Sequence, residues 1–511
     1  MAEGPSSKPR TLPEPPAGSG SEPDRVPADY RARNNKVIWL LLVATFVVIL
    51  NETIMSVALR VIMLDLHIDT RSVQWLSTAF MLTMAVVIPI TGFLLQRFHT
   101  RPMFAAAMTL FCTGTLMAGL SPGFELLIVA RVVQACGTAI MLPLLMTTIM
   151  TLVPADERGK TMGNVSIVIS VAPAIGPTIS GLILNALSWR WLFWLVLPIA
   201  VVMLIIGVRR VENVSEPRRL HLDVPSVVLS ALGFGGLIYG LSRVGEDGAP
   251  QSRAGTGAGT ALPMWIALAV GAAGLAAFII RQLRLQPHGR ALLDLSTFRS
   301  RTFTMAIAMM ALMMMALFGT IIVLPLYLQQ VLGLQPVQTG LLLLPGGLVM
   351  GLLAPLVGRL YDRYGPTVLL VPGSIIVSTV LWVLSTVGQD TSPFFVLAAH
   401  LLLSLGMALL FTPLFTAGLG AVEPQLYSHG SAIVGTVQQV AGAAGTALFV
   451  TVLAVQTSAF SAGGAADRSA AAGGSRAAFL AGAVISVLAV AAAFFIRKPP
   501  DLPGAPSSGS P

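Results

Sequence analysis

Charged side chains are scarce in this chain: Asp, Glu, Lys and Arg make up only 10% of its 511 residues. A soluble domain carries about 25%, so the composition excludes a globular protein with a water-exposed surface. Hydrophobic residues make up 55% of the chain, and the mean hydropathy is +0.81. We therefore predict a polytopic membrane protein.

Cysteine is almost absent, which excludes a disulfide framework. Cys112 and Cys136 both lie inside apolar segments, and we interpret them as small core residues. The chain also lacks HExxH and GxSxG motifs. The GKT of "DERGKT" at Asp156 follows Pro154, where a phosphate-binding loop needs glycine. These absences predict that the protein is not an enzyme and has no metal site and no cofactor.

The positions of the basic residues indicate the topology of the chain in the membrane. The formal charge is +9 and the pI is near 10.1, but Lys and Arg form short clusters between apolar runs, so we expect no nucleic-acid partner. Most clusters lie on the side that holds the N-terminus, which the positive-inside rule assigns to the cytoplasm. Residues 1–35 and 498–511 are polar and rich in Pro, Gly and Ser, and we predict that both tails are disordered.

Fourteen apolar stretches are long enough to cross the membrane, since a helix of about 20 residues spans the hydrocarbon. An even number of spans places both termini on one side, here the cytoplasm. The stretches cover approximately residues 37–59, 72–95, 102–120, 123–153, 160–187, 189–208, 224–243, 262–281, 302–331, 337–360, 366–388, 392–420, 428–457 and 476–496.

The two halves of the chain contain a repeat. "GFLLQRFHTRP" from Gly92 and "GRLYDRYGP" from Gly358 each have a Leu two residues and an Arg five residues after the Gly. Two proline pairs recur with one spacing of eleven residues: Pro143 with Pro154, and Pro413 with Pro424. We infer a parallel duplication of a six-helix unit. It predicts an N-terminal bundle over 36–210, a C-terminal bundle over 301–497, and a linker over 211–300 with two inserted helices.

Three ionisable residues lie well inside the predicted spans: Glu52, Arg131 and His400. From the helical rise we estimate their depths as about 12, 10 and 10 Å from the outer ends of their spans. A common depth suggests one cavity, because buried ionisable groups in membranes usually face a bundle interior and mark a transport path. The alternatives are that Arg131 is only a counter-ion for Glu52, and that His400 is hydrogen-bonded within the core.

Glu52 is the strongest candidate for moving protons. A carboxyl group becomes neutral at modest cost by binding a proton. Burial favours the protonated form and a nearby Arg131 favours the carboxylate, so movement of either helix can switch the proton affinity.

The order of segments resembles the fourteen-span drug:proton antiporters of the major facilitator superfamily, from Lys36 to Lys498. "LNETIMSVAL" is similar to that branch's first-span signature, which has an acid where Asn51 stands, one position before Glu52. "RVVQACGTA" matches the fourth-span pattern of Arg131 followed by Gln134. The resemblance implies that Glu52 and Arg131 serve proton coupling.

Other signatures of the family are conformational. In the fifth span the antiporter glycine pattern is filled by Gly163, Ala172, Gly176, Pro177, Ser180 and Gly181. The segment from Gly92, with Arg97 and Arg101, resembles the facilitator loop after the second span, although Gln96 replaces the usual acid. The second copy has Gly358, Asp362 and Arg363. "LYSHGSAIVGTVQQVAGAAGTAL" from Leu426 is similar to the lincomycin-resistance type.

The resemblance implies an all-α major facilitator fold and a proton-coupled efflux antiporter in the plasma (inner) membrane of a bacterium. Its expected partners are a lipophilic or cationic small-molecule drug, protons and membrane lipid; no oligomeric state is predicted. We assign five residues to the substrate cavity: Asn51, Gln134, Tyr327, Gln330 and His400. Tyr327 and Gln330 alternatively meet the membrane interface. An exporter of an endogenous metabolite and a membrane sensor without flux are the alternative functions.

Overall fold

The structure is a computed structural model that describes residues 28–213, 217, 221–247 and 261–497. All regular elements in these ranges are helical, and fourteen spans among them are long and apolar enough to cross a membrane. This confirms the all-α fold with fourteen transmembrane helices. The predicted disordered tails lie largely outside the described residues.

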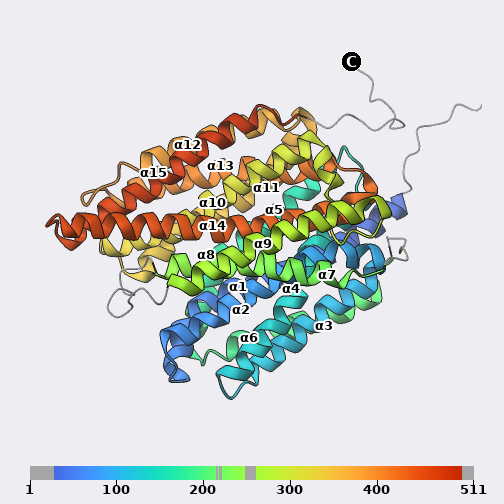
Figure 1. Cartoon of the computed structure of the whole chain (residues 1–511), viewed down its shortest axis with the longest axis horizontal. Coiled ribbons are helices and arrows are strands. Elements are labelled where there is room, and N and C mark those ends of the chain that lie inside the picture. The colour runs from blue at the N-terminus through green and yellow to red at the C-terminus, as the bar shows by residue number, and fades with distance from the viewer. Residues whose placement is uncertain (1–27, 214–216, 218–220, 248–260, 498–511) are drawn as a thin grey trace, which may run out of the picture.

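The first set of six long helices runs from α1 to α6. Its members are α1 (Ala28–Asp65), α2 (Thr70–Arg97), α3 (Thr100–Gly119), α4 (Phe124–Leu152), α5 (Arg158–Ala186) and α6 (Trp191–Arg210). The second set consists of α10 (Arg301–Gln330), α11 (Pro336–Tyr364), α12 (Thr367–Leu384), α13 (Pro393–Gly420), α14 (Tyr427–Ala462) and α15 (Asp467–Ala493). In Figure 1 the blue and cyan helices α1, α2, α3, α4 and α6 lie below the yellow to red helices of the second set.

Helix α1 begins earlier than predicted. The segment 28–35 was expected to be part of a disordered tail, but it is the first part of α1. A long apolar helix supplies the nucleus, after which each added residue contributes a backbone hydrogen bond, so the helix extends beyond the membrane. For the same reason α15 begins at Asp467, ahead of the predicted start at residue 476.

The alternation of fourteen spans gives the molecule two ends. We call the end where α1 begins and α15 ends the terminal face, and the other end the opposite face. The chain crosses to the opposite face along α1, and the terminal face receives the α2–α3 connection and the α11–α12 connection. The terminal face is on the right in Figure 1.

The inserted pair consists of α7 (Val224–Ser230), a π-helical turn η1 (Ala231–Gly235), α8 (Gly236–Asp247) and α9 (Ala261–Leu285). Glycines let its two arms approach closely, since a Cβ on Gly236 would lie 2.9 Å from the Cα of Gly271. The η1 turn packs on α2 and α8 packs on both α2 and α14, so the pair covers the seam between the two sets on one flank (Figure 1).

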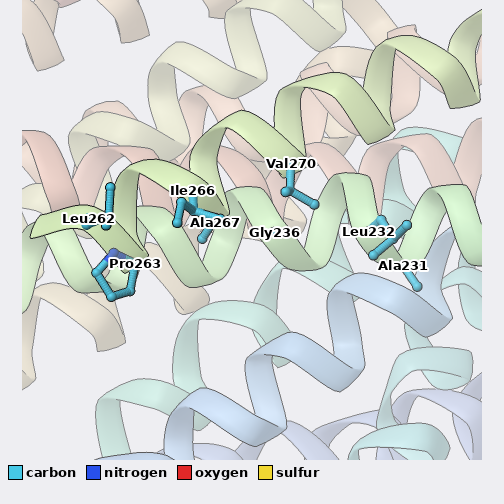
Figure 2. A pocket seen from close by; sticks show the side chains of 8 residues that line it. All are labelled: Ala231, Leu232, Gly236, Leu262, Pro263, Ile266, Ala267 and Val270. Atoms are coloured by element: carbon cyan, nitrogen blue, oxygen red, sulfur yellow. The ribbon is translucent and has the colours of Figure 1, made fainter.

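An apolar groove of about 530 Å³ lies between the arms of this inserted pair (Figure 2). It is lined by Ala231, Leu232, Gly236, Leu262, Pro263, Ile266, Ala267 and Val270. Ile266 and Leu262 are 53% and 63% exposed, which suits a helix that faces lipid.

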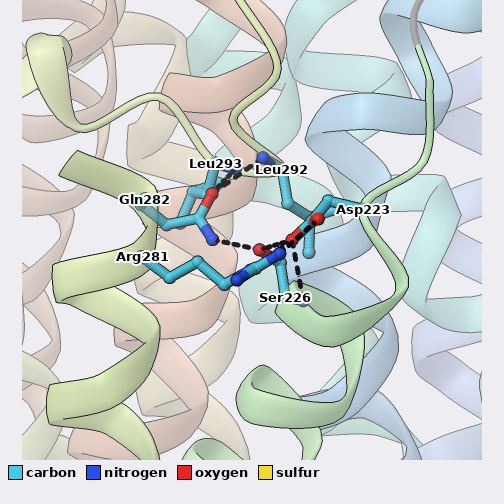
Figure 3. Close-up of polar contacts among 6 residues, drawn as sticks. All are labelled: Asp223, Ser226, Arg281, Gln282, Leu292 and Leu293. Atoms are coloured by element: carbon cyan, nitrogen blue, oxygen red, sulfur yellow. Dashed lines mark hydrogen bonds and ion pairs between the residues drawn. The ribbon is translucent and has the colours of Figure 1, made fainter. Parts of the chain in front are cut away.

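A polar network fixes the inserted pair at the terminal face (Figure 3). Asp223 accepts hydrogen bonds from Arg281 Nε at 2.6 Å and Nη2 at 2.7 Å, and it caps α7 by accepting from the backbone of Ser226. The Arg281 guanidinium holds the pKa of Asp223 well below its usual range. Gln282 donates to the Ser226 hydroxyl and accepts from the backbone of Leu292, so the pair is joined to the segment that leads into α10.

The two sets meet along α5 and α11. Near the terminal face a Cβ on Gly358 would lie 2.2 Å from the carbonyl oxygen of Gly159. Midway along the helices a Cβ on Gly347 would lie 2.3 Å from the Cβ atom of Ala174. Small residues therefore allow the backbones to touch over this length.

The same seam is less tightly packed toward the opposite face. Gly340 precedes Gly347 by two helical turns and Gly181 follows Ala174 by two turns, so both continue the contact stripe. No described atom of another helix lies within 4 Å of a Cβ built on either glycine. The seam is therefore tightly packed near the terminal face and less tightly packed around Gly340 and Gly181.

Candidate functional site

Arg131 lies on α4, is only 2% exposed, and has its guanidinium held on three sides. Its Nη1 donates to Gln134 Oε1 at 2.6 Å, and its Nε donates to the carbonyl oxygen of Leu76 on α2 at 3.4 Å. The guanidinium carbon lies 4.0 Å from the centre of the Phe80 ring. These contacts fix both the position and the plane of the charge.

Gln134 is the support of Arg131. Its amide nitrogen donates to Thr115 on α3 at 2.8 Å, and the Thr115 hydroxyl donates to the carbonyl oxygen of Phe111 at 2.7 Å. Gly114 allows this arrangement because a Cβ there would lie 2.6 Å from the backbone nitrogen of Gln134. The amide of Gln134 is thus committed to positioning Arg131. No sequence pattern indicates this role of Thr115.

Glu52 lies on α1 opposite this fixed charge. The charges of Glu52 and Arg131 interact electrostatically. Among the described residues, however, Glu52 makes no ion pair within 4.0 Å. The neighbouring Asn51 is 2% exposed, and its amide oxygen has no hydrogen-bond partner in the described part of the chain. A half-buried carboxyl near a positive charge, but not bound to it, retains the freedom to exchange a proton.

The fifth-span signature clasps α1 immediately after Glu52. The hydroxyl of Thr53 donates to the carbonyl oxygens of Leu50 at 2.9 Å and of Ala172 at 3.4 Å. Gly176 is needed at this point, since a Cβ there would lie 2.3 Å from the Thr53 hydroxyl oxygen. The turn of α1 that carries Glu52 is therefore tied to α5.

Other members of the signature have different surroundings. A Cβ on Gly163 would lie 2.6 Å from the carbonyl oxygen of Ala354 on α11, so Gly163 belongs to the seam. Ser180 donates to the carbonyl oxygen of Ile54 at 3.0 Å. Pro177 is exposed, and Gly181 has no described atom of another helix within 4 Å of a Cβ built on it.

His400 lies on α13, and its Nε2 lies 3.1 Å from the carbonyl oxygen of Leu343 on α11. It packs against Gly346, where a Cβ would lie 2.3 Å from Nε2. The next glycine, Gly347, touches Ala174 on α5, two residues from the contact of Gly176 with Thr53. His400 and the turn that bears Glu52 therefore lie in one layer of the protein, on either side of the α5–α11 seam.

Tyr327 and Gln330 lie apart from this layer, at the opposite face. The Tyr327 hydroxyl donates to the carbonyl oxygen of Gly388 at 2.7 Å, and the residue is 1% exposed. Gln330 is exposed at the end of α10. The Tyr327 hydroxyl is thus committed to the connection between α12 and α13.

Each set of helices has an arginine clamp at the opposite face that the sequence did not reveal. In the first set Arg190 donates to the carbonyl oxygen of Ser121 at 3.1 Å and pairs with Asp65 at 3.2 Å. A hydrogen bond from Trp189 and the Arg190 guanidinium lower the pKa of the Asp65 carboxyl. In the second set Arg468 donates to the carbonyl oxygens of Val331 and Gln389, at 2.6 and 3.3 Å.

The two copies of the repeated loop both bridge the two sets of helices at the terminal face. Asp362 accepts from the backbone nitrogens of Gly159 at 2.7 Å and Lys160 at 2.8 Å, in the first turn of α5. A carboxylate at a helix N-terminus is stabilised by the unpaired N–H groups and the helix dipole. In the first copy Gln96 donates to the carbonyl oxygen of Gln425 at 3.0 Å, just before α14.

The remaining residues of these loops are arranged around the two contacts. Gly92 is buried against α14, where a Cβ would lie 3.0 Å from His429 Nδ1. Arg97 and Arg101 are exposed, and the backbone nitrogen of Arg101 donates to Asn213 at 3.2 Å. Arg363 is exposed with its guanidinium 5.2 Å from the centre of the Tyr364 ring.

No cluster of three or more His, Cys, Asp or Glu side chains suited to a metal ion occurs in the described ranges. The chemistry that these residues offer is the binding of protons, charge and hydrogen-bonding groups in a membrane interior.

Comparisons with known proteins agree with this architecture. The model of the Major Facilitator Superfamily matches residues 41–446. An uncharacterized MFS-type transporter of Bacillus subtilis, YcnB, is 40% identical over 463 residues, which cover 91% of this chain and 95% of YcnB. The lincomycin resistance protein LmrB of Listeria monocytogenes is 38% identical over 467 residues, 90% of this chain and 96% of LmrB.

Solved structures show the same fold at low identity. The human organic anion transporter MFSD10 superposes with a TM-score of 0.62 at 12% identity, over 90% of this chain and 99% of MFSD10. The proton:xylose symporter XylE superposes with a TM-score of 0.58 at 14% identity, over 90% and 95% of the two chains. With its family match, its relatives and its helical arrangement in agreement, the chain belongs to the Major Facilitator Superfamily and is a multi-pass membrane transporter, not an enzyme.

Proposed function

We propose that the protein is a proton-coupled efflux antiporter for lipophilic or cationic drugs, lincosamides included. One observation carries the proposal: the carboxyl of Glu52 is half-buried within a membrane-spanning helix and has no ion pair among the described residues, while the charge of Arg131 acts on it from a fixed position. The relatives named for lincomycin resistance support a drug as the cargo.

Alternating access between two six-helix units, within which single helices can shift, is the proposed mechanism. The units are residues 36–210 and 301–497, with the linker 211–300 between them, and each has an arginine clamp that holds its connections together. The α5–α11 seam is the surface on which they rock, and its looser packing around Gly340 and Gly181 supports a state that opens at the opposite face. The basic clusters of the sequence favour a cytoplasmic terminal face.

Glu52 couples the two movements. In the state open to the outside, Glu52 binds a proton and the drug leaves. When the seam opens at the terminal face, the clasp between Thr53 and α5 shifts the turn that carries Glu52 relative to Arg131. The proton then leaves to the cytoplasm and the carboxylate accepts a cationic cargo. Because proton and drug compete for one site, the exchange is obligatory.

Proton release driven by drug in proteoliposomes tests the proposal. The purified protein is reconstituted with an internal pH dye, a proton gradient is imposed, and lincomycin, a quaternary ammonium compound and a dye are added in turn. We expect Glu52→Gln to lower drug-dependent proton flux at least about tenfold while the amount of folded protein stays the same. The control is Glu125→Gln, an exposed acid in the first turn of α4. Undiminished flux in Glu52→Gln would refute the assignment.

A further inference from the structure

Arg131 and His400 are counterparts in the two halves of the molecule. Each lies seven residues after the first residue of its helix, Phe124 in α4 and Pro393 in α13. Each donates a hydrogen bond to a leucine carbonyl near the start of the neighbouring helix, Leu76 in α2 and Leu343 in α11. The duplicated fold thus places one nitrogen-bearing side chain at the same point of each half.

The two side chains differ in their charge and in the hydrogen-bonding groups that remain free after that bond is made. Arg131 has a permanent charge, and its other contacts are Gln134 and the Phe80 ring. In His400 the bond to a carbonyl oxygen requires the hydrogen to be on Nε2. The neutral ring then has Nδ1 as a bare acceptor. Nδ1 is buried and has no hydrogen-bond partner among the described residues.

The slot around His400 fixes the ring in this orientation. Gly346 provides the space on α11, since a Cβ there would lie 2.3 Å from Nε2 and 2.6 Å from the hydroxyl oxygen of Ser404. Ser404 is one helical turn after His400 and lines the same slot. Within the described residues, the ring makes one hydrogen bond, from Nε2 to the Leu343 carbonyl oxygen.

We propose that His400 Nδ1 is the hydrogen-bond acceptor for an O–H or N–H donor of the cargo, and that it selects cargo with such a donor over cargo of equal charge without one. The inference rests on the proposed drug-efflux function. A site with a buried acceptor discriminates against a ligand that leaves the acceptor unpaired. Glu52 recognises the charge of the cargo on one side of the layer, and His400 recognises a donor on the other.

Two lipophilic cations serve as probes: ethidium, which has two amino groups, and tetraphenylphosphonium, which has no donor. Affinities are measured by titration of the purified protein in lipid nanodiscs. The variants separate the two ring nitrogens. His400→Gln places an amide N–H near Nε2 and removes the acceptor at Nδ1. His400→Asn places an amide oxygen near Nδ1 and abandons the bond to Leu343.

We expect His400→Gln to weaken ethidium binding about tenfold and to leave tetraphenylphosphonium binding unchanged. His400→Asn should retain most of the ethidium affinity. Equal weakening of both probes, or no change in either, overturns the inference, because a merely structural histidine would not distinguish them. Binding of tetraphenylphosphonium but not ethidium by the unaltered protein also overturns it. Failure of the unaltered protein to bind either probe overturns the proposed function as well.

Discussion

The side-chain amide of Gln96 donates a hydrogen bond of 3.0 Å to the carbonyl oxygen of Gln425. This bond joins the end of α2, in the first set of helices, to the start of α14, in the second set. Its counterpart in the repeat is Asp362, which accepts from the first turn of α5. The terminal face is therefore closed by a donor in one half and an acceptor in the other. This difference explains how the protein closes without the acid that related loops have at the position of Gln96.

The first prediction concerns that missing acid. Gln96→Glu restores the residue of the family pattern, yet we expect it to weaken closure of the terminal face. A carboxylate cannot donate to the Gln425 carbonyl and is repelled by it. The loss should be about 1 kcal/mol, or several-fold in the ratio of closed to open states.

Spin-label distances between α2 and α14 at the terminal face measure this ratio. Gln330→Glu is the matched control, because Gln330 is exposed at the opposite face. A shift toward the closed state in Gln96→Glu would show that the bond to Gln425 does not keep α2 and α14 together at the terminal face.

The second prediction concerns the charge of Asp362. Asp362→Asn keeps one oxygen acceptor but loses the negative charge at the N-terminus of α5. We expect the closed state to lose about 1–2 kcal/mol, measured as increased labelling of a cysteine placed on the terminal half of α5. Asp390→Asn, an exposed acid in the α12–α13 connection, should change nothing. Equal labelling in the two variants would argue against the Asp362 contact.

The third prediction compares two glycines of the fifth-span signature. In Gly163→Ala the added methyl would lie 2.6 Å from the Ala354 carbonyl, so α5 and α11 must separate. In Gly181→Ala no described atom of another helix lies within 4 Å of the methyl. We expect Gly163→Ala to populate the state open at the terminal face and to reduce transport, with Gly181→Ala near neutral. Spin-label distances across the seam and drug flux measure both. Loss of transport in Gly181→Ala would indicate that the less tightly packed part of the seam must also close tightly.

The fourth prediction asks whether Arg131 acts only through its charge. Arg131→Lys keeps the charge, but an ammonium cannot donate to Gln134 and Leu76 in the same plane while lying over the Phe80 ring. We expect drug-dependent proton flux to fall at least about tenfold, with cargo binding less affected. Full flux in Arg131→Lys would mean that a positive charge alone suffices. Arg243→Lys, outside this network, provides the control for the substitution itself.

The fifth prediction is a pH dependence at the inserted pair. Arg281 lowers the pKa of Asp223 in the folded protein, so the pair stabilises the folded state above the unfolded pKa of about 4. That stabilisation is lost as the pH falls through the folded pKa. Asp223→Asn should lower the unfolding temperature by a constant amount between pH 7 and about pH 4, and the difference should shrink at lower pH. A difference that grows on acidification would contradict the sign.

The sequence by itself determined the class and the count of elements. Long apolar stretches must be helices in lipid, because no water is present to satisfy free backbone groups. The fourteen spans followed from length alone, and the repeat from Gly92 and Gly358 predicted which loops are equivalent. The polar exceptions, Glu52, Arg131 and His400, were visible because an ionisable residue in a membrane span is costly and therefore informative.

Only the tertiary structure decided what these residues contact. Hydrogen bonds to backbone carbonyls, such as those of Arg131 to Leu76, His400 to Leu343 and Gln96 to Gln425, depend on distances between helices and leave no trace in side-chain pattern. The sequence suggested that Tyr327 lines a cavity, but it contains no sign that the Tyr327 hydroxyl donates to the carbonyl oxygen of Gly388. The uneven packing of the seam likewise depends on tertiary structure, since Gly347 touches Ala174 whereas no described atom of another helix lies within 4 Å of a Cβ on Gly340. Which end of a seam is shut is a property of the state of the protein, and one sequence must serve both states.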